Sequence, residues 1–178
     1  MGTAVITGAG RGLGKAIASR LASDGHSIIA VDLDGETAES TAATVGGEAR
    51  QCDVSDWASV DALAASIDAC DILVNNAGIW HYDSLLESTP EHVTSVLGVN
   101  VVGTIACSRA FAPKMIASGG GSIVNLASAA AWTNSPGTGI YPATKAAVIS
   151  LTKQMAIEWG EHGIRANAVG PGLVVTEG

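Results

Sequence analysis

VITGAGRGLGKAIASRLA, residues 5–22, joins an apolar run to an amphipathic segment through a glycine-rich turn. Gly8, Gly12 and Gly14 lie where a buried strand is expected to end and a helix to begin. Glycines at that point let the main chain turn tightly and approach a pyrophosphate, whose negative charge the helix N-terminus favours. The spacing TGxxxGxG fits the common GxGxxG pattern only loosely, so a glycine turn without a ligand stays an alternative.

The end of the next apolar run indicates which dinucleotide this turn would bind. Asp32 closes that run, 24 residues after Gly8. A carboxylate at this position accepts hydrogen bonds from an adenosine ribose and repels a 2′-phosphate. Arg11, inside the turn, favours the opposite choice, since a guanidinium can hold such a phosphate. We give Asp32 more weight, because its charge lies beside the ribose, and the sequence predicts NAD rather than NADP.

Short apolar runs alternate with longer amphipathic segments along the whole chain. The predicted strands are 3–7, 27–32, 48–53, 71–76, 122–128 and 164–170, and the predicted helices are 12–23, 35–45, 57–67, 90–117 and 141–160. This alternation predicts an α/β fold, in which helices cover both faces of a parallel sheet. Right-handed crossovers favour a doubly wound, Rossmann-type sheet with strand order 3-2-1-4-5-6. Residues 1–178 contain no internal repeat and no linker, so we expect a single domain.

The composition excludes several classes of protein. Apolar residues make up 47% of the 178 residues and charged residues 15%, which is typical of a packed domain and not of a disordered chain. The net charge of −8 repels phosphate backbones, so nucleic acid is not an expected partner. The sequence shows neither an apolar run long enough to predict a membrane span nor the charge pattern of a cleaved signal.

The cysteines and histidines predict a reducing, cytoplasmic setting and no metal site. Cys52, Cys70 and Cys107 are odd in number and contain no CxxC pair, which favours buried thiols. The four histidines show no ligand spacing with one another or with the cysteines; they are His26, His81, His92 and His162.

GIYPATKAAV, residues 139–148, places a tyrosine four positions before a lysine. In a helix Tyr141 and Lys145 share one face, close enough to act together. Pro142 between them is tolerated in a first helical turn, where no intrahelical N–H bond is lost. The pair alone is also compatible with a solvated helix face, so its meaning depends on the rest of the chain.

Five motifs in register resemble those of the short-chain dehydrogenases/reductases. They are the TGxxxGxG turn, Asp53-Val54 after the third predicted strand, NNAG at 75–78, the serine that closes the fifth predicted strand, and YxxxK thirteen residues after it. The similarity extends over the whole chain, to PGLVVT at 171–176. A methyltransferase on a related sheet would not need Ser128, Tyr141 and Lys145 in register.

The resemblance implies an oxidoreductase that transfers a hydride between NAD(H) and a secondary alcohol or ketone. In its catalytic group, Tyr141 is the general acid/base, and Lys145 with the oxidised nicotinamide supplies the positive charge that stabilises the phenolate. Ser128 holds the substrate oxygen, although a serine that only caps the end of the strand is an alternative. Asn100 positions a water that relays protons from Lys145, although an Asn that only bonds to main chain is an alternative for this position.

The resemblance also implies which residues contact the cofactor. These residues are Gly8, Arg11, Gly12, Leu13, Gly14, Asp32, Asp53, Val54, Asn76, Ala77, Gly78, Tyr141, Lys145, Pro171, Gly172, Val174 and Thr176. Trp80 and Trp132 follow the motifs closely and are candidates for an apolar substrate pocket, though core packing or simple exposure explains them almost as well.

Three further expectations depend on the resemblance. Family members carry a substrate lid and a seventh strand after the segment that corresponds to residues 171–176, so we expect the functional protein to continue beyond Gly178. Helices corresponding to 90–117 and 141–160 pair across a two-fold axis in the family, so we expect a homotetramer or dimer. A non-catalytic nucleotide-binding fragment or scaffold of the same fold is the alternative to an enzyme.

Overall fold

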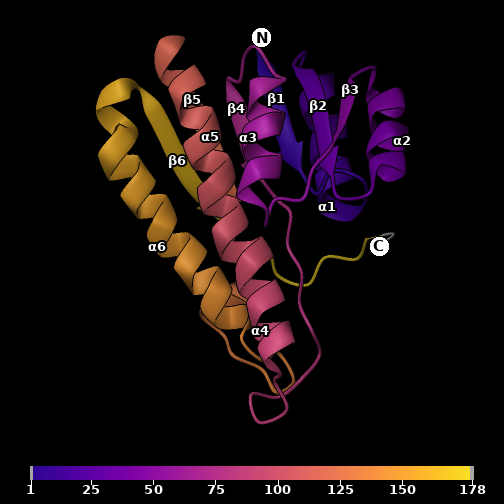
Figure 1. Cartoon of the computed structure of the whole chain (residues 1–178), viewed down its shortest axis with the longest axis vertical. Helices are drawn as coiled ribbons and strands as arrows, with labels where there is room; N and C mark the ends of the chain where they lie inside the picture. Colours follow the sequence, from indigo (N-terminus) through magenta and orange to yellow (C-terminus); the bar gives the residue numbers. More distant parts are fainter. Residues whose placement is uncertain (1, 177–178) are drawn as a thin grey trace.

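Six parallel strands form one sheet in the order that the sequence predicts. The computed structural model describes residues 2–176. Its strands are β1 (Thr3–Thr7), β2 (Ser27–Asp32), β3 (Glu48–Gln51), β4 (Ile72–Asn75), β5 (Gly121–Leu126) and β6 (Ile164–Val169). They lie in the order β3-β2-β1-β4-β5-β6, and each neighbouring pair is parallel (Figure 1). The prediction of a doubly wound α/β sheet is therefore confirmed.

Helices cover both faces of this sheet. They are α1 (Gly12–Ser23), α2 (Gly35–Val45), α3 (Trp57–Ala65), α4 (Pro90–Leu97), α5 (Gly103–Ala117) and α6 (Tyr141–Trp159). Ala18 and Ala42 belong to the core cluster on the face covered by α1 and α2. The helices α3, α5 and α6 cover the other face (Figure 1), where the core cluster is larger. Phe111 of α5 is fully buried there.

The predicted boundaries are right to within one or two residues, and the differences have local causes. β3 stops at Gln51, two residues early, because the next carboxylate turns the chain: Asp53 Oδ1 accepts hydrogen bonds from the N–H and the hydroxyl of Ser55, at 2.9 and 2.7 Å. β5 stops at Leu126. Ser128, predicted within that strand, instead caps a short 3₁₀ turn by accepting from Ala130 N at 3.1 Å.

The prediction of one unbroken helix over 90–117 is partly wrong. Residues Gly98–Val102 form a π-helical turn between α4 and α5. By length and composition the helix Pro90–Ala117 could cross a membrane, but half of that window is buried inside the protein. Its partners are α3, α6 and the strands, so a core helix of the α/β sandwich explains its composition.

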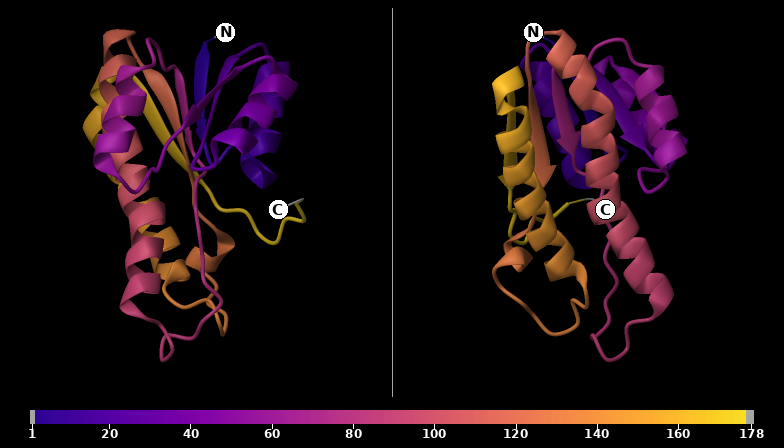
Figure 2. Two further views of the ribbon diagram at one scale, coloured as in Figure 1. Left: turned by 45° about the vertical axis from the view of Figure 1, so that its right-hand side comes forward. Right: turned by 60° about the vertical axis from the view of Figure 1, so that its left-hand side comes forward.

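The carboxyl ends of the strands all meet at one end of the sheet. Two long connections, residues 76–89 and 127–140, extend beyond this end together with α4 and the first turns of α6 (Figure 2). In open α/β sheets ligands bind at the carboxyl ends of the strands, where the strand order reverses. That reversal lies between β1 and β4.

Candidate active site

A cleft of about 520 Å³ lies at this point of reversal, a volume ordinary for a cofactor site. Nearly all predicted site residues line it, drawn from the carboxyl ends of the six strands, the segments that follow them, and the first turns of α1 and α6. They are Gly8, Arg11, Gly12, Leu13, Asp32, Asp53, Val54, Asn76, Ala77, Gly78, Ser128, Tyr141, Lys145, Pro171, Gly172, Val174 and Thr176. Gly14 and Asn100 are not among the residues that line the cleft.

The glycine turn is shaped by contacts that leave no room for side chains. Gly8 has a φ of +63°, which favours glycine. A Cβ on Gly14 would lie 2.0 Å from the carbonyl oxygen of Gly8, so only glycine permits this approach of helix and turn. Asn76 then locks the turn from β4, because its Nδ2 donates to the carbonyl oxygens of Thr7 and Gly8 at 3.0 and 2.9 Å.

The N-terminus of α1 faces this cleft without a side-chain cap. Arg11 occupies the N-cap position in an extended conformation and makes no capping hydrogen bond. The first N–H groups of a helix need a partner, and the helix dipole makes an anion a favourable one. The turn and the helix start therefore fit a pyrophosphate group.

Asp32 lies at the other side of the glycine turn, at the end of β2. Its Oδ2 accepts from Gly10 N at 2.8 Å, and its Oδ1 accepts from Asp34 N at 3.2 Å. The carboxylate is thus held by two main-chain groups while it still lines the cleft. It places a carboxylate at the cleft, beside the glycine turn.

Ser128, Tyr141 and Lys145 all line this cleft. Lys145 is 4% exposed, and its Nζ donates to the carbonyl oxygen of Leu126 at 2.7 Å. The same Nζ lies 5.6 Å from the centre of the Tyr141 ring. Burial lowers the pKa of Lys145 from 10.5 to about 8, because the charged ammonium is poorly solvated there. The predicted cation is therefore present at neutral pH, but it titrates closer to neutrality than an exposed lysine.

Asn100 is buried behind the cleft, in the π-helical turn. Its Oδ1 accepts from Ile79 N at 2.8 Å, and its Nδ2 donates to Ile79 O at 2.9 Å and to Thr144 Oγ1 at 3.1 Å. The main-chain carbonyl oxygen of Asn100 accepts a hydrogen bond from the hydroxyl of Thr104 at 2.8 Å. The side chain thus holds main chain, which was the alternative for this position, and the relay role stays a prediction.

Comparison with known proteins agrees with this arrangement. A family model described as short chain dehydrogenase matches residues 2–178. The chain belongs to this family. The D-threitol dehydrogenase of Mycolicibacterium smegmatis is 42% identical over 183 residues, which cover 98% of this chain and 70% of that protein. The sorbitol dehydrogenase of Cereibacter sphaeroides is 41% identical over 179 residues, covering 97% and 70%.

A solved structure extends the similarity to three dimensions. The 3-ketoacyl-(acyl-carrier-protein) reductase from Brucella melitensis, complexed with NADH, superposes with a TM-score of 0.95 at 36% identity. The superposition covers 98% of this chain and 77% of that one. Together with the family match, it confirms the resemblance that the motifs indicate.

The two tryptophans that follow the predicted motifs of this short-chain dehydrogenase differ in their placement. Trp80 lines the cleft, and its ring centre lies 6.3 Å from that of Tyr141. Trp132 is 69% exposed and does not line the cleft. Its ring lies so close to Gly170 that a Cβ there would be 2.7 Å from Cζ3. Of the two candidates, only Trp80 lines the cleft.

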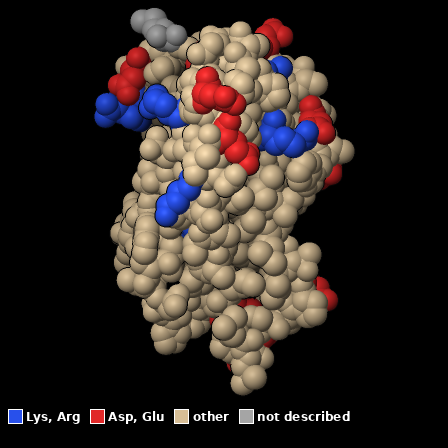
Figure 3. All heavy atoms as spheres, turned by 90° about the vertical axis from the view of Figure 1, so that its left-hand side faces the viewer, with Lys and Arg blue, Asp and Glu red and all other residues tan. Residues whose placement is uncertain are grey.

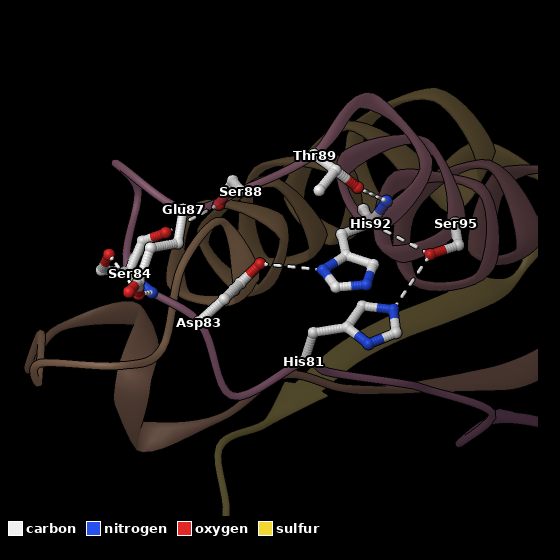
Figure 4. A network of polar contacts seen from close by, with 8 residues as sticks. All are labelled: His81, Asp83, Ser84, Glu87, Ser88, Thr89, His92 and Ser95. Carbon is white, nitrogen blue, oxygen red and sulfur yellow. Dashed lines mark hydrogen bonds and ion pairs between the residues drawn. The ribbon is translucent and has the colours of Figure 1, made fainter.

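A second polar cluster lies on the connection between β4 and α4 (Figure 4). The rings of His81 and His92 stack, with centres 4.0 Å apart and planes 10° from parallel. His92 Nδ1 lies 3.1 Å from Asp83 Oδ2, and His81 Nε2 lies 3.2 Å from Ser95 Oγ. Within residues 2–176, no group of His, Cys, Asp and Glu side chains is arranged to hold a metal ion. The connection between β4 and α4 contains Trp80, and the cluster binds this connection to the first turns of α4.

Sequence reasoning missed two residues that shape the site. Thr7 ends β1, and its hydroxyl oxygen accepts from Asn76 N and Ala77 N, each at 3.1 Å. A polar residue at the carboxyl end of a buried strand was the available signal. Thr144 lies inside the YxxxK motif and accepts from Asn100. The spacing gave no signal for it, because its partner is 44 residues away.

Proposed function

We propose that this short-chain dehydrogenase transfers a hydride between NAD(H) and a secondary alcohol or its ketone. One observation carries the proposal: Ser128, Tyr141 and Lys145 line the same cleft as the glycine turn and Asp32. When bound, the nicotinamide accepts the hydride in alcohol oxidation and donates it in ketone reduction.

The side chains of this chain supply the proton and hold the substrate. Tyr141 takes the proton of the substrate hydroxyl during oxidation and returns it during reduction. Lys145 faces the ring of Tyr141 and stabilises the phenolate by its charge. Ser128 donates a hydrogen bond to the substrate oxygen, on which negative charge develops. Asn100 keeps the Ile79 wall of the cleft in place and takes part in the proton relay from Lys145.

The choice of NAD over NADP depends on Asp32. Its carboxylate accepts hydrogen bonds from ribose hydroxyls and repels a 2′-phosphate at the same position. Arg11 is exposed in the glycine turn and binds the pyrophosphate without overriding this repulsion. Residues of the segment from Pro171 to Thr176 line the cleft, and we propose that they contact the nicotinamide.

The substrate class follows from the relatives and from the wall around Tyr141. The two relatives named above act on D-threitol and on sorbitol, which are polyhydroxy alcohols. Trp80 beside Tyr141 provides an aromatic face on which the carbon chain of such an alcohol can lie. We therefore propose small secondary alcohols, polyols included, as the substrate class.

A coupled activity and binding assay tests the function. The purified chain is mixed with NAD or NADP and a panel of D-threitol, sorbitol and simple secondary alcohols, and the appearance of reduced nicotinamide is followed by absorbance. Turnover with NAD and at least one member of the panel is expected. Tight NADH binding without turnover of any alcohol or ketone would instead favour the non-catalytic nucleotide-binding protein.

Assembly into a dimer or tetramer belongs to the same proposal. The side of the molecule formed by α6 and β6 shows few charged side chains over its lower part (Figure 3). Ile157 of α6 and Ile116 of α5 are 76% and 39% exposed. Exposed apolar side chains on these two helices favour association. Sedimentation of the wild-type chain at micromolar concentration should give an oligomer, and a monomer would contradict this.

A cytoplasmic location is proposed from the thiols. Cys52, Cys70 and Cys107 are free and buried. Burial raises the pKa of Cys70 and of Cys107 to about 12, so neither is reactive at neutral pH. Chains that keep free thiols are typical of reducing compartments.

A further inference from the structure

Thr144 lies in the first turn of α6, between Tyr141 and Lys145. The residue is 1% exposed. Its hydroxyl donates to the main-chain carbonyl oxygen of Tyr141 at 2.7 Å. Threonines in helices often bond to the preceding turn in this way, so this contact alone indicates only local helix structure.

The hydroxyl oxygen of Thr144 also accepts a hydrogen bond from outside α6. Asn100 Nδ2 donates to it at 3.1 Å and to Ile79 O at 2.9 Å, while Asn100 Oδ1 accepts from Ile79 N at 2.8 Å. The N–H of Ile79 can only donate, which fixes the orientation of the Asn100 amide. With the hydrogen of Thr144 committed to Tyr141 O, each polar atom of this chain of bonds has its partner.

This chain of hydrogen bonds connects two walls of the cleft. Ile79 lines the cleft next to Trp80, and Tyr141 lines it from α6. Asn100 and Thr144 join them, and both side chains are buried. An unpaired polar group at such a depth is costly, so removing one member disturbs the others.

We propose that Thr144 is a positioning residue, which holds the Tyr141 turn of α6 in register with the Ile79 wall through Asn100. The effect on turnover rests on the proposed function of Tyr141 as the proton donor and acceptor. Thr144 itself does not line the cleft. It acts because Tyr141 is the first residue of α6, where the main-chain N–H has no partner within the helix.

The same helix contains a matched control. Thr152, two turns further along α6, donates to Val148 O at 2.7 Å and accepts from Asn125 Nδ2 at 2.9 Å. It is 4% exposed, so its burial is close to that of Thr144. Neither Thr152 nor Asn125 lines the cleft. Replacing either threonine by valine therefore removes an equivalent pair of bonds, and only one replacement disturbs the cleft.

The first measurement compares turnover of T144V, T144S and T152V with that of the wild type. T144V should lower kcat by about 100-fold, the effect expected of a small misplacement of a catalytic group, with little change in NADH affinity. T144S keeps the hydroxyl and should restore kcat to within about three-fold of the wild type. T152V should leave kcat unchanged, although it and T144V should lose similar thermal stability.

The second measurement needs no substrate. The amide hydrogen of Ile79, bonded to Asn100, is followed by hydrogen exchange in the ligand-free chain. T144V should accelerate its exchange by about ten-fold or more relative to global unfolding, while T152V and T144S should not.

The two measurements separate the inference from the proposed function. If no alcohol is turned over by the wild type, the proposed function fails, and the exchange of Ile79 still decides whether Thr144 holds this wall. Unchanged exchange in T144V overturns the inference. Equal losses of kcat in T144V and T152V overturn it as well, because both would then report only general destabilisation.

Discussion

The ammonium group of Lys145 donates a hydrogen bond to the main-chain carbonyl oxygen of Leu126, at a distance of 2.7 Å from Nζ. The bond joins α6 to the last residue of β5 and fixes the ammonium beside Tyr141. The position is buried, so the fold keeps a charge in a site where solvation is poor. The charge that the proposed function requires at Lys145 is therefore expected to lower the free energy of unfolding.

Lys145→Met should stabilise the protein at neutral pH. The pKa of Lys145 is lowered from 10.5 to about 8 by burial, so between these pH values the unfolded chain binds more protons and stability rises with pH. Below about pH 8 the full cost of burying the charge is present, ~3 kcal/mol. Loss of the bond to Leu126 offsets ~1 kcal/mol of this.

Denaturant unfolding at several pH values measures this effect. The variant should exceed the wild type in free energy of unfolding by ~2 kcal/mol near pH 7. The difference should shrink as the pH rises from about 8 to 10.5. A difference that does not depend on pH would show that charge burial is not its cause.

Tyr141→Phe should abolish most turnover while it leaves the cleft intact. The ring is kept and the exchangeable proton is lost, so kcat should fall by a factor on the order of 10²–10⁴. NADH affinity should stay within about three-fold of the wild type. Tyr82, the only other tyrosine, is 83% exposed, and Tyr82→Phe serves as the control with normal kcat. Near-normal turnover by the Tyr141 variant would refute the assignment.

Asp32→Asn should weaken discrimination against NADP. The amide keeps an oxygen for Gly10 N but removes the charge, and one charge at contact distance is worth ~1–4 kcal/mol. The ratio of kcat/KM for NAD and NADP should fall by about ten-fold or more. Asp34→Asn is the control, because Asp34 caps α2 at an exposed position and asparagine caps equally well. A wild type that already prefers NADP would contradict the role of Asp32.

Gly14→Ala should damage cofactor binding through the main chain. The new Cβ would lie 2.0 Å from Gly8 O, so α1 and the glycine turn must separate. We expect a loss of ~1–3 kcal/mol in stability and a weaker affinity for NADH. Gly160→Ala is the control, since a Cβ there meets nothing within 4 Å and its φ of −62° suits alanine. Its stability should be unchanged or raised by ~0.5–1 kcal/mol. Equal behaviour of the two variants in NADH titrations would exclude a special role for Gly14.

The fold was predictable from the sequence because its signals are local and repeated. Six apolar runs alternate with five amphipathic segments, and glycine turns and motif residues mark the carboxyl ends of the strands. The cleft-lining residues were predictable for the same reason, since in a parallel sheet those ends meet at one edge.

The connections between distant residues were not predictable from spacing. The link of Asn100 to Thr144 joins residues 44 positions apart, and the contact of Asn75 Nδ2 with Asn125 Oδ1, at 2.8 Å across β4 and β5, joins residues 50 apart. A buried asparagine gives no indication of its partner until the strand register is known. The depressed pKa of Lys145 was missed likewise, because burial depends on the packing of α6 and not on YxxxK.

The π-helical turn at Gly98–Val102 makes the site sensitive to chain length as well as to residue type. Such a turn holds one residue more than an α-helix allows, and each residue of an α-helix rotates the next by about 100°. Removal of a single residue here would restore continuous winding and swing Asn100 away from Ile79 without altering any motif. A one-position gap at this point in an alignment therefore marks a relative that lacks the hydrogen bonds between Asn100 and Ile79. This holds even where the serine, tyrosine and lysine of the motifs are all retained.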